Sequence, residues 1–251
     1  MKKALISLLS ISSLVGAVNV DLNLEPLKSD TGWTTGHNNS TKTHVPSIDS
    51  EQGTLTYNSG DWSRGYAVYT LGQAITLKTT DDTLTFSMTI QTTNTNSLIL
   101  GTLMGNTQSL TFGHGAYNDN THLQMGTSTV TNGTFYNMQS QGTGGTYVAE
   151  ESFSATGWAA NTAITLTSTI AWSEDVHGFV ATVTYGNGTL LGTTGSLGQT
   201  FSLEKISLSV DGASSQTVSN VQLSAHLVPE PTTATLSLLA LAGLAARRRR
   251  K

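Results

Sequence analysis

The chain contains no cysteine. This absence excludes disulfide frameworks, thiolate catalysis and cysteine-based zinc sites together. Charged residues are scarce as well, at 11% of the 251 residues. The sequence also lacks a Gly-x-Ser-x-Gly elbow, a phosphate-binding loop and a dinucleotide fingerprint, which removes the hydrolase and nucleotide-binding classes that depend on them. No long stretch has the 3.6-residue apolar period of an amphipathic helix, so the body of the chain is not expected to be helical.

Positive charge is concentrated at the two ends of the chain. Seven of the twelve basic residues are Lys2, Lys3 and the residues of the segment 247–251. Between Val18 and Pro231 there are five basic residues against sixteen acidic ones, a net charge of −11. A body this acidic is a poor surface for phosphate backbones, and we therefore expect no nucleic-acid partner.

The first 17 residues have the layout of a secretory signal peptide. Lys2 and Lys3 precede an apolar stretch over residues 4–15, which small residues at Gly16 and Ala17 follow. A basic start, a short apolar run and a small-residue cleavage site are the three parts of such a peptide. The sequence predicts an N-terminal signal helix over residues 1–17 and export through the secretion translocon, with cleavage after Ala17.

The C-terminal segment combines an apolar run with a block of cations. Residues 232–246 would form a helix of about 22 Å, shorter than the ~30 Å hydrocarbon core of a bilayer. The five cationic residues after it, 247–251, stay on the cytoplasmic side of the inner membrane, so the segment acts as a stop signal. Pro229 and Pro231 flank Glu230 in a stretch that cannot be helical.

These residues resemble a known sorting signal. The order Val228-Pro229-Glu230-Pro231, apolar helix and arginine cluster (Arg247, Arg248, Arg249 and Arg250) is similar to the PEP-CTERM signal of Gram-negative bacteria. The resemblance implies that exosortase, a membrane protease-transpeptidase, cuts near Pro-Glu-Pro and passes the protein to the cell surface or extracellular matrix. Residues 228–251 are therefore assigned to a sorting signal that tethers the chain to the inner membrane transiently.

The body of the chain has a period of two. In the stretch 84–90 apolar residues alternate with threonine and serine, as a half-buried strand requires. The stretch 179–185 alternates likewise and leads through Asn187-Gly188 into 189–191, which predicts a hairpin. Further strands are expected at 54–57, 66–71, 98–103, 109–113, 121–125, 146–153, 164–172, 206–210 and 218–225.

Many short strands separated by turn residues predict an all-β fold, an antiparallel β-sandwich over residues 54–226 with residues 18–53 as a segment that joins it. The main alternative is a β-helix, but no repeat of 20–50 residues is present. The succession of strands from 54 to 225, with the turn Tyr185-Gly186-Asn187-Gly188, is similar to laminin-G or concanavalin-like jelly rolls. This resemblance implies a sandwich of the kind that binds carbohydrate.

A carbohydrate-binding platform is expected in the stretch GDWSRGY. It contains Asp61, Trp62, Arg64 and Tyr66, and the last three would share one face of a strand. Sugars stack their apolar C–H faces on aromatic rings while their hydroxyls bind Asp and Arg. The alternative is that Trp62 caps the core and Arg64 pairs with Asp61. Trp172, at the end of an apolar strand, is expected in the core.

No catalytic residue is predicted. The Glu-x-Asp-x-x-Glu signature of laminarinase-type hydrolases, whose carboxylates point into one cleft, is absent. The pairs Glu150-Glu151 and Glu174-Asp175 are adjacent, so in a strand the two side chains of each pair would face opposite ways. These residues are expected in solvated loops.

No metal site is predicted either, although two sets of residues carry suitable side chains. His114, Asp119 and His122 could converge on a metal ion from a loop. Calcium would instead use oxygens from residues 118–120 or from Asp81 and Asp82. Neither set has the spacing of an established ligand loop, and the alternative is a set of turns rich in Asn and Asp.

The sequence therefore predicts an exported, exosortase-processed protein of a Gram-negative cell surface or matrix, whose sandwich binds a glycan or exopolysaccharide without catalysis. Two alternatives stay open at this point. One is a purely structural matrix component. The other is a glycoside hydrolase or lyase whose active site has no recognisable pattern.

Overall fold

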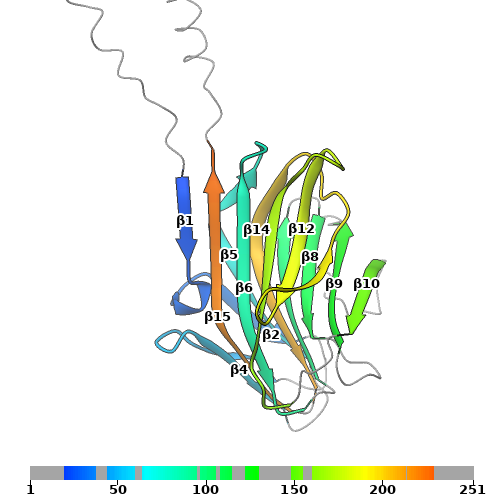
Figure 1. Cartoon of the computed structure of the whole chain (residues 1–251). Helices are drawn as coiled ribbons and strands as arrows, with labels where there is room; N and C mark the ends of the chain where they lie inside the picture. Colours follow the sequence, from blue (N-terminus) through cyan, green and yellow to red (C-terminus); the bar gives the residue numbers. More distant parts are fainter. Residues whose placement is uncertain are drawn as a thin grey trace, which may run out of the picture.

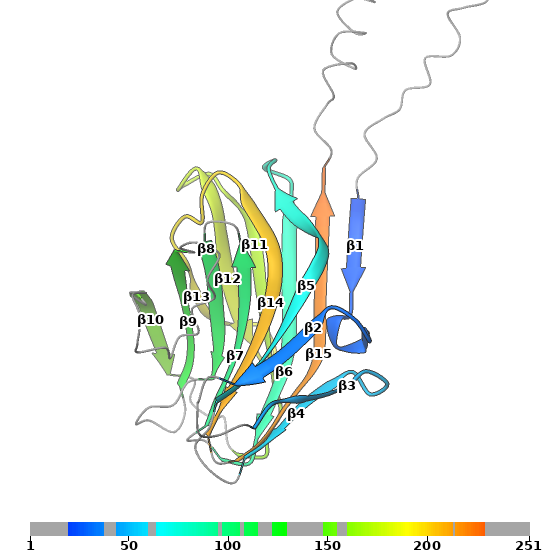
Figure 2. The same cartoon turned by 180° about the vertical axis from the view of Figure 1, so that it is seen from behind.

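A computed structural model describes residues 20–37, 44–59, 64–94, 97–105, 108–114, 122–129, 148–154, 160–212 and 214–228. In these residues the chain forms two antiparallel sheets that pack face to face (Figures 1 and 2). The predicted all-β antiparallel sandwich is therefore confirmed. The helices expected at the two ends, in residues 1–17 and 232–246, lie outside the described residues. Within the described ranges, no helix has the length and apolar character needed to cross a membrane.

The two sheets draw their strands from all parts of the chain. The first, sheet A, has the order β13 (Thr189–Thr193), β12 (Gly178–Tyr185), β11 (Ile164–Ser173), β6 (Thr83–Thr92), β15 (Ser215–Leu227), β4 (Thr54–Asn58) and β3 (Ser47–Asp49), with β1 (Val20–Leu24) also paired to β15. The second, sheet B, has the order β10 (Val148–Ser154), β9 (His122–Thr129), β8 (Gln108–His114), β7 (Leu98–Gly105), β14 (Phe201–Asp211), β5 (Arg64–Leu77) and β2 (Trp33–His37). Every strand pair is antiparallel, and a 3-10 helix (Pro26–Lys28) follows β1.

The core lies between the sheets and follows the period-two pattern. The apolar residues of β6 are fully buried, and Phe86 contacts Phe112 of sheet B edge to face, with ring centroids 5.8 Å apart. The sheets approach closely at Gly101, where a Cβ atom would lie 2.8 Å from the Met88 sulfur. Trp172 packs against Phe179 at the border of this core, as predicted, with ring centroids 5.5 Å apart.

The predicted hairpin is confirmed, but its loop is longer than the Asn-Gly pair alone. Tyr185 of β12 pairs with Thr189 of β13, which leaves a three-residue loop of Gly186, Asn187 and Gly188. Both glycines have positive φ angles, 57° and 90°, which a residue with a side chain adopts only at a cost. The loop is therefore closed by two glycines.

The segment before residue 54 contributes three strands that the sequence did not indicate. β1, β2 and β3 are three to five residues long and have few apolar positions, so their alternation is too short to recognise. They pair with β15, β5 and β4 respectively. Leu27 of the 3-10 helix between β1 and β2 is buried in the core.

Candidate ligand-binding surfaces

Of the predicted carbohydrate platform, the structure describes the side chain of Tyr66 and the backbone of Arg64. Asp61 and Trp62 lie outside the described residues. Arg64 is the first residue of β5, where its backbone pairs with that of Asp211 in β14. Tyr66 lies two residues further along β5, and its ring lies over Gly36 of β2. Tyr66 thus lies on the face of sheet B that points away from the core.

Buried hydroxyl side chains lie on the strands of sheet B that follow Tyr66. The residue paired with Tyr66 across β14 is Ser209, and Ser207 pairs with Thr102 of β7. The hydroxyls of Thr102 and Thr111 are 3.0 Å apart. The hydroxyl of Ser207 is buried and has no hydrogen-bond partner. These four hydroxyl residues are at most 5% exposed, so they are not accessible to a ligand, whereas Tyr66 is half-buried.

A larger set of hydroxyls covers the outer face of sheet A. The outward positions of the four strands β12, β11, β6 and β15 alternate with the buried core positions. We call the hydroxyl-bearing outward residues of these strands the hydroxyl face: Thr182, Thr184, Thr165, Thr167, Thr169, Ser173, Thr83, Thr85, Ser87, Thr89, Ser215, Thr217, Ser219 and Ser224. These four strands place no Asp, Glu, Lys or Arg on this side. Their one outward histidine is His226, near the end of β15.

The strand register aligns the hydroxyl face into rows across the sheet. One row runs through Thr182, Thr169, Thr85 and Ser224 of the hydroxyl face, and the register extends it to Thr193 of β13 on one side and Asn23 of β1 on the other. A second row joins Thr184, Thr167 and Ser87. A third joins Thr165, Thr89 and Ser219, in which the Thr165 and Thr89 hydroxyls are 2.9 Å apart. Alternating Thr and Ser in the sequence was the signal for this face, but on its own that alternation indicates only strands.

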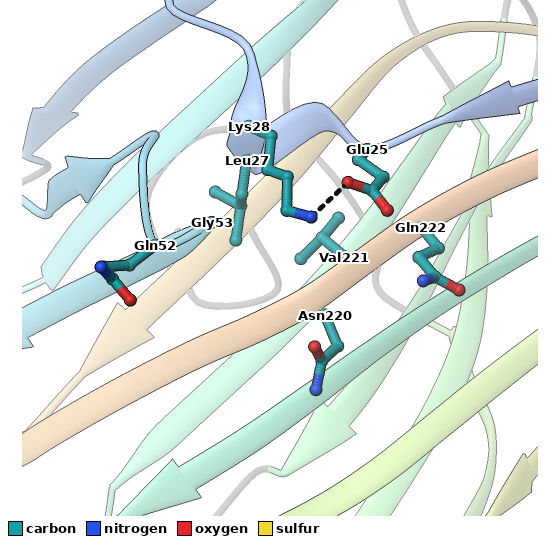
Figure 3. A pocket seen from close by; sticks show the side chains of 8 residues that line it. All are labelled: Glu25, Leu27, Lys28, Gln52, Gly53, Asn220, Val221 and Gln222. Carbon is teal, nitrogen blue, oxygen red and sulfur yellow. Dashed lines mark ion pairs between the residues drawn. The ribbon is translucent and has the colours of Figure 1, made fainter.

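A small polar pocket lies at one edge of sheet A (Figure 3). β15 pairs with β4 up to Ser219 and with β1 from Leu223 onward, and residues 220–222 between these pairings line the pocket. Lys28 and Glu25 form an ion pair of 2.7 Å beside it. The cavity volume is about 40 Å³, far below the roughly 300–1,000 Å³ range of ligand sites. A single small polar group would fill it.

A buried carboxylate holds the end of the last strand. Asp82, in the turn between β5 and β6, is 2% exposed. One of its oxygens accepts backbone N–H groups of Lys78 and Thr79 at 2.7 and 2.9 Å, and the other accepts the N–H of Val228 at 2.7 Å. Burial raises the pKa of this carboxyl, but the three N–H donors lower it, and the net pKa lies below its ordinary value. Both oxygens of Asp82 thus accept backbone N–H groups, whereas its neighbour Asp81 is exposed.

The two ends of the described fold meet at the same place. β1 and β15 run side by side, and Val20 pairs with Leu227 (Figures 1 and 2). Asp21 and His226, the next pair along, are linked by a contact of 2.6 Å between carboxylate and ring nitrogen. The expected signal-peptide cleavage site and the Pro-Glu-Pro sequence therefore adjoin neighbouring strands.

The remaining predicted chemical groups do not form a site in the described residues. Glu174 lies with Asp175 in an exposed turn, as expected. Glu150 and Glu151 belong to β10, a strand rather than the expected loop. His114 is completely buried in β8, whereas Asp119 lies outside the described residues. The described part of the chain contains no group of three or more His, Cys, Asp or Glu side chains that could hold a metal ion.

A comparison with protein families identifies the C-terminal segment of the chain. Residues 227–251 match the PEP-CTERM protein-sorting motif. The resemblance that the sequence indicated is therefore confirmed for this segment, and it implies export and processing by exosortase at the membrane. No curated protein matches the sequence.

Several solved lectin structures are similar to the described fold. Lectin II from Ulex europaeus has 11% identity and a TM-score of 0.47, covering 83% of this chain and 99% of the lectin. The Lotus tetragonolobus seed lectin has 10% identity and a TM-score of 0.46, with coverage of 84% and 100%. The potassium-bound Emp46p carbohydrate recognition domain has 11% identity and a TM-score of 0.46, with coverage of 77% and 88%. At these TM-scores the likeness carries no conclusion about ligand or activity.

Proposed function

We propose that this chain is an exported protein of the cell surface or extracellular matrix of a Gram-negative bacterium, and that its sandwich binds a glycan or exopolysaccharide without catalysis. The observation that carries the destination is the sorting motif at residues 227–251, which begins where β15 ends. Exosortase and the secretion translocon are the partners during processing. The inner membrane is a transient attachment through the C-terminal segment.

The glycan-binding part of the proposal is supported by the outer face of sheet A, which carries rows of partly exposed threonine and serine. On sheet B the half-buried Tyr66 adds an aromatic side chain. Each hydroxyl is one donor and two acceptors, which is the same inventory that a sugar hydroxyl offers. As part of this proposal, the sandwich is a concanavalin-like jelly roll.

Two measurements test the proposal. Intact-mass analysis of the protein isolated from its native cells should show a chain that lacks both the first 17 residues and the residues after the Pro-Glu-Pro sequence. The same processed protein on a glycan array should bind at least one polysaccharide at micromolar concentration and should release no reducing sugar from it. A full-length chain in the cytosol would refute the export, and sugar release would refute the absence of catalysis.

A structural matrix component is the second candidate, and the charge of the body favours it. The net charge of −11 between residues 18 and 231 keeps copies of the protein apart and hydrated in an extracellular layer. A processed protein that binds no glycan, and whose deletion weakens the matrix, would establish this function instead.

A further inference from the structure

We infer that the hydroxyl face of sheet A is a binding site for an uncharged polysaccharide. The inference rests on the proposed glycan-binding function and assigns it a site and a ligand class. It starts from the strands β12, β11, β6 and β15, whose outward side chains include threonine and serine in rows but no Asp, Glu, Lys or Arg.

Charge decides which polymers suit this face. None of the sixteen acidic residues of the chain lies on these four strands, although the body carries a net charge of −11. An anionic polysaccharide would need cations on the face and would be repelled by the rest of the surface. An uncharged polymer meets neither obstacle, so the complementary partner is neutral.

Hydrogen bonding excludes an apolar partner. Thr85, Thr167 and Thr169 present hydroxyls on the two central strands, and covering them with an apolar surface would leave these polar groups without partners. Thr89 and Thr165 bond to each other at 2.9 Å, and each oxygen still has capacity to accept a further hydrogen bond. A partner that is itself rich in hydroxyls satisfies all of these groups.

The regular spacing of the face favours a repeating partner. Neighbouring strands are about 4.8 Å apart, and alternate residues along a strand are about 6.7 Å apart. Because the register places hydroxyls opposite one another over several strands, the same hydrogen-bonding groups recur in two directions. A polymer with repeated hydroxyls can bind several rows at once, and this multivalency adds weak single contacts into measurable affinity.

The test compares two triple variants of the mature protein at Thr85, Thr167 and Thr169. The variant T85V/T167V/T169V removes three hydroxyls but keeps β-branched side chains of the same shape, which preserves the preference for strand. The matched control T85S/T167S/T169S keeps the hydroxyls. Binding is measured by pull-down with microcrystalline cellulose and by titration with laminarin, and alginate serves as the anionic comparison. Thermal melting confirms that both variants fold.

We expect the wild type to bind cellulose or laminarin more tightly than alginate. Each lost hydrogen bond should weaken binding about two- to tenfold, so the valine variant should bind at least about eightfold more weakly, and the serine variant within about threefold of the wild type. Wild-type affinity in the valine variant overturns the inference. If Tyr66→Ala then abolishes binding, the glycan function stands and its site is on sheet B.

Two further outcomes separate this inference from the proposed function. A wild-type protein that binds none of the three polysaccharides overturns the inference, and a glycan array without any hit overturns the proposed glycan binding as well.

Sedimentation of the wild type at increasing concentration tests a second copy of the chain as the occupant. Self-association that the valine variant loses, in the absence of polysaccharide binding, overturns the inference in favour of assembly.

Discussion

Replacing Asp82 by asparagine should destabilise the fold although Asp82 is not part of the hydroxyl face. Its two oxygens accept three backbone N–H groups, from Lys78, Thr79 and Val228. The amide of an asparagine side chain has a single oxygen, so at least one donor loses its acceptor inside a site that is 2% exposed. A hydrogen bond to a charged group contributes about 1.5–3 kcal/mol. We expect a loss of about 3 kcal/mol, which lowers the melting temperature by about 6–12 °C.

The same carboxylate should make stability depend on pH. Its pKa in the fold lies below the ordinary value of 3.8, because the three N–H donors outweigh the effect of burial. A group with a lowered pKa contributes stability above its unfolded pKa, and this contribution is lost as the pH falls through the folded pKa. The difference in unfolding free energy between wild type and Asp82→Asn should therefore have its largest value near pH 7 and become smaller below about pH 4.

Thermal melts of the mature protein at several pH values, together with amide exchange, measure these effects. Asp81→Asn is the matched control, since Asp81 is the exposed neighbour and loses the same charge. Exchange of the Val228 amide should become faster in Asp82→Asn and stay unchanged in Asp81→Asn. Equal melting temperatures for the two variants, or unchanged protection of Val228, would refute the role assigned to the Asp82 carboxylate.

Two other substitutions test the packing and the junction of the termini. Gly113→Ala should lower the free energy of unfolding by about 3 kcal/mol, because its φ is 150° and an added Cβ would lie 2.9 Å from the Leu100 Cα. Urea unfolding measures this loss, and Gly72→Ala is the control, since its added Cβ would meet nothing within 4 Å. Equal stability of these two variants would contradict the described contact. Asp21→Asn breaks the contact with His226, but both groups are largely exposed, so the free energy of unfolding should change by less than about 1 kcal/mol. A larger loss would mean that this pair, and not the strand pairing, holds β1 in place.

The sequence was sufficient for features that depend on neighbouring residues. The strict alternation over residues 84–90 identified β6, and the glycine-rich turn after Tyr185 identified the hairpin of β12 and β13. The Pro-Glu-Pro sequence, the apolar run and the arginines identified the sorting signal because their order along the chain is itself the signal. Tyr66 was correctly placed on a strand, β5.

Other features depend on pairings between distant parts of the chain, and no local pattern contains them. β1, β2 and β3 are too short to show a period and exist through their partners. From the sequence, Asp82 is a turn residue or a candidate calcium ligand. Its contact with the Val228 N–H depends on the tertiary structure, because the two residues are far apart in the chain.

The sequence by itself determined which residues face outward, because alternation along a strand is local. Only the tertiary structure decided that Thr182, Thr169, Thr85 and Ser224 stand in one row, since the register between strands is set by the packing of the whole core.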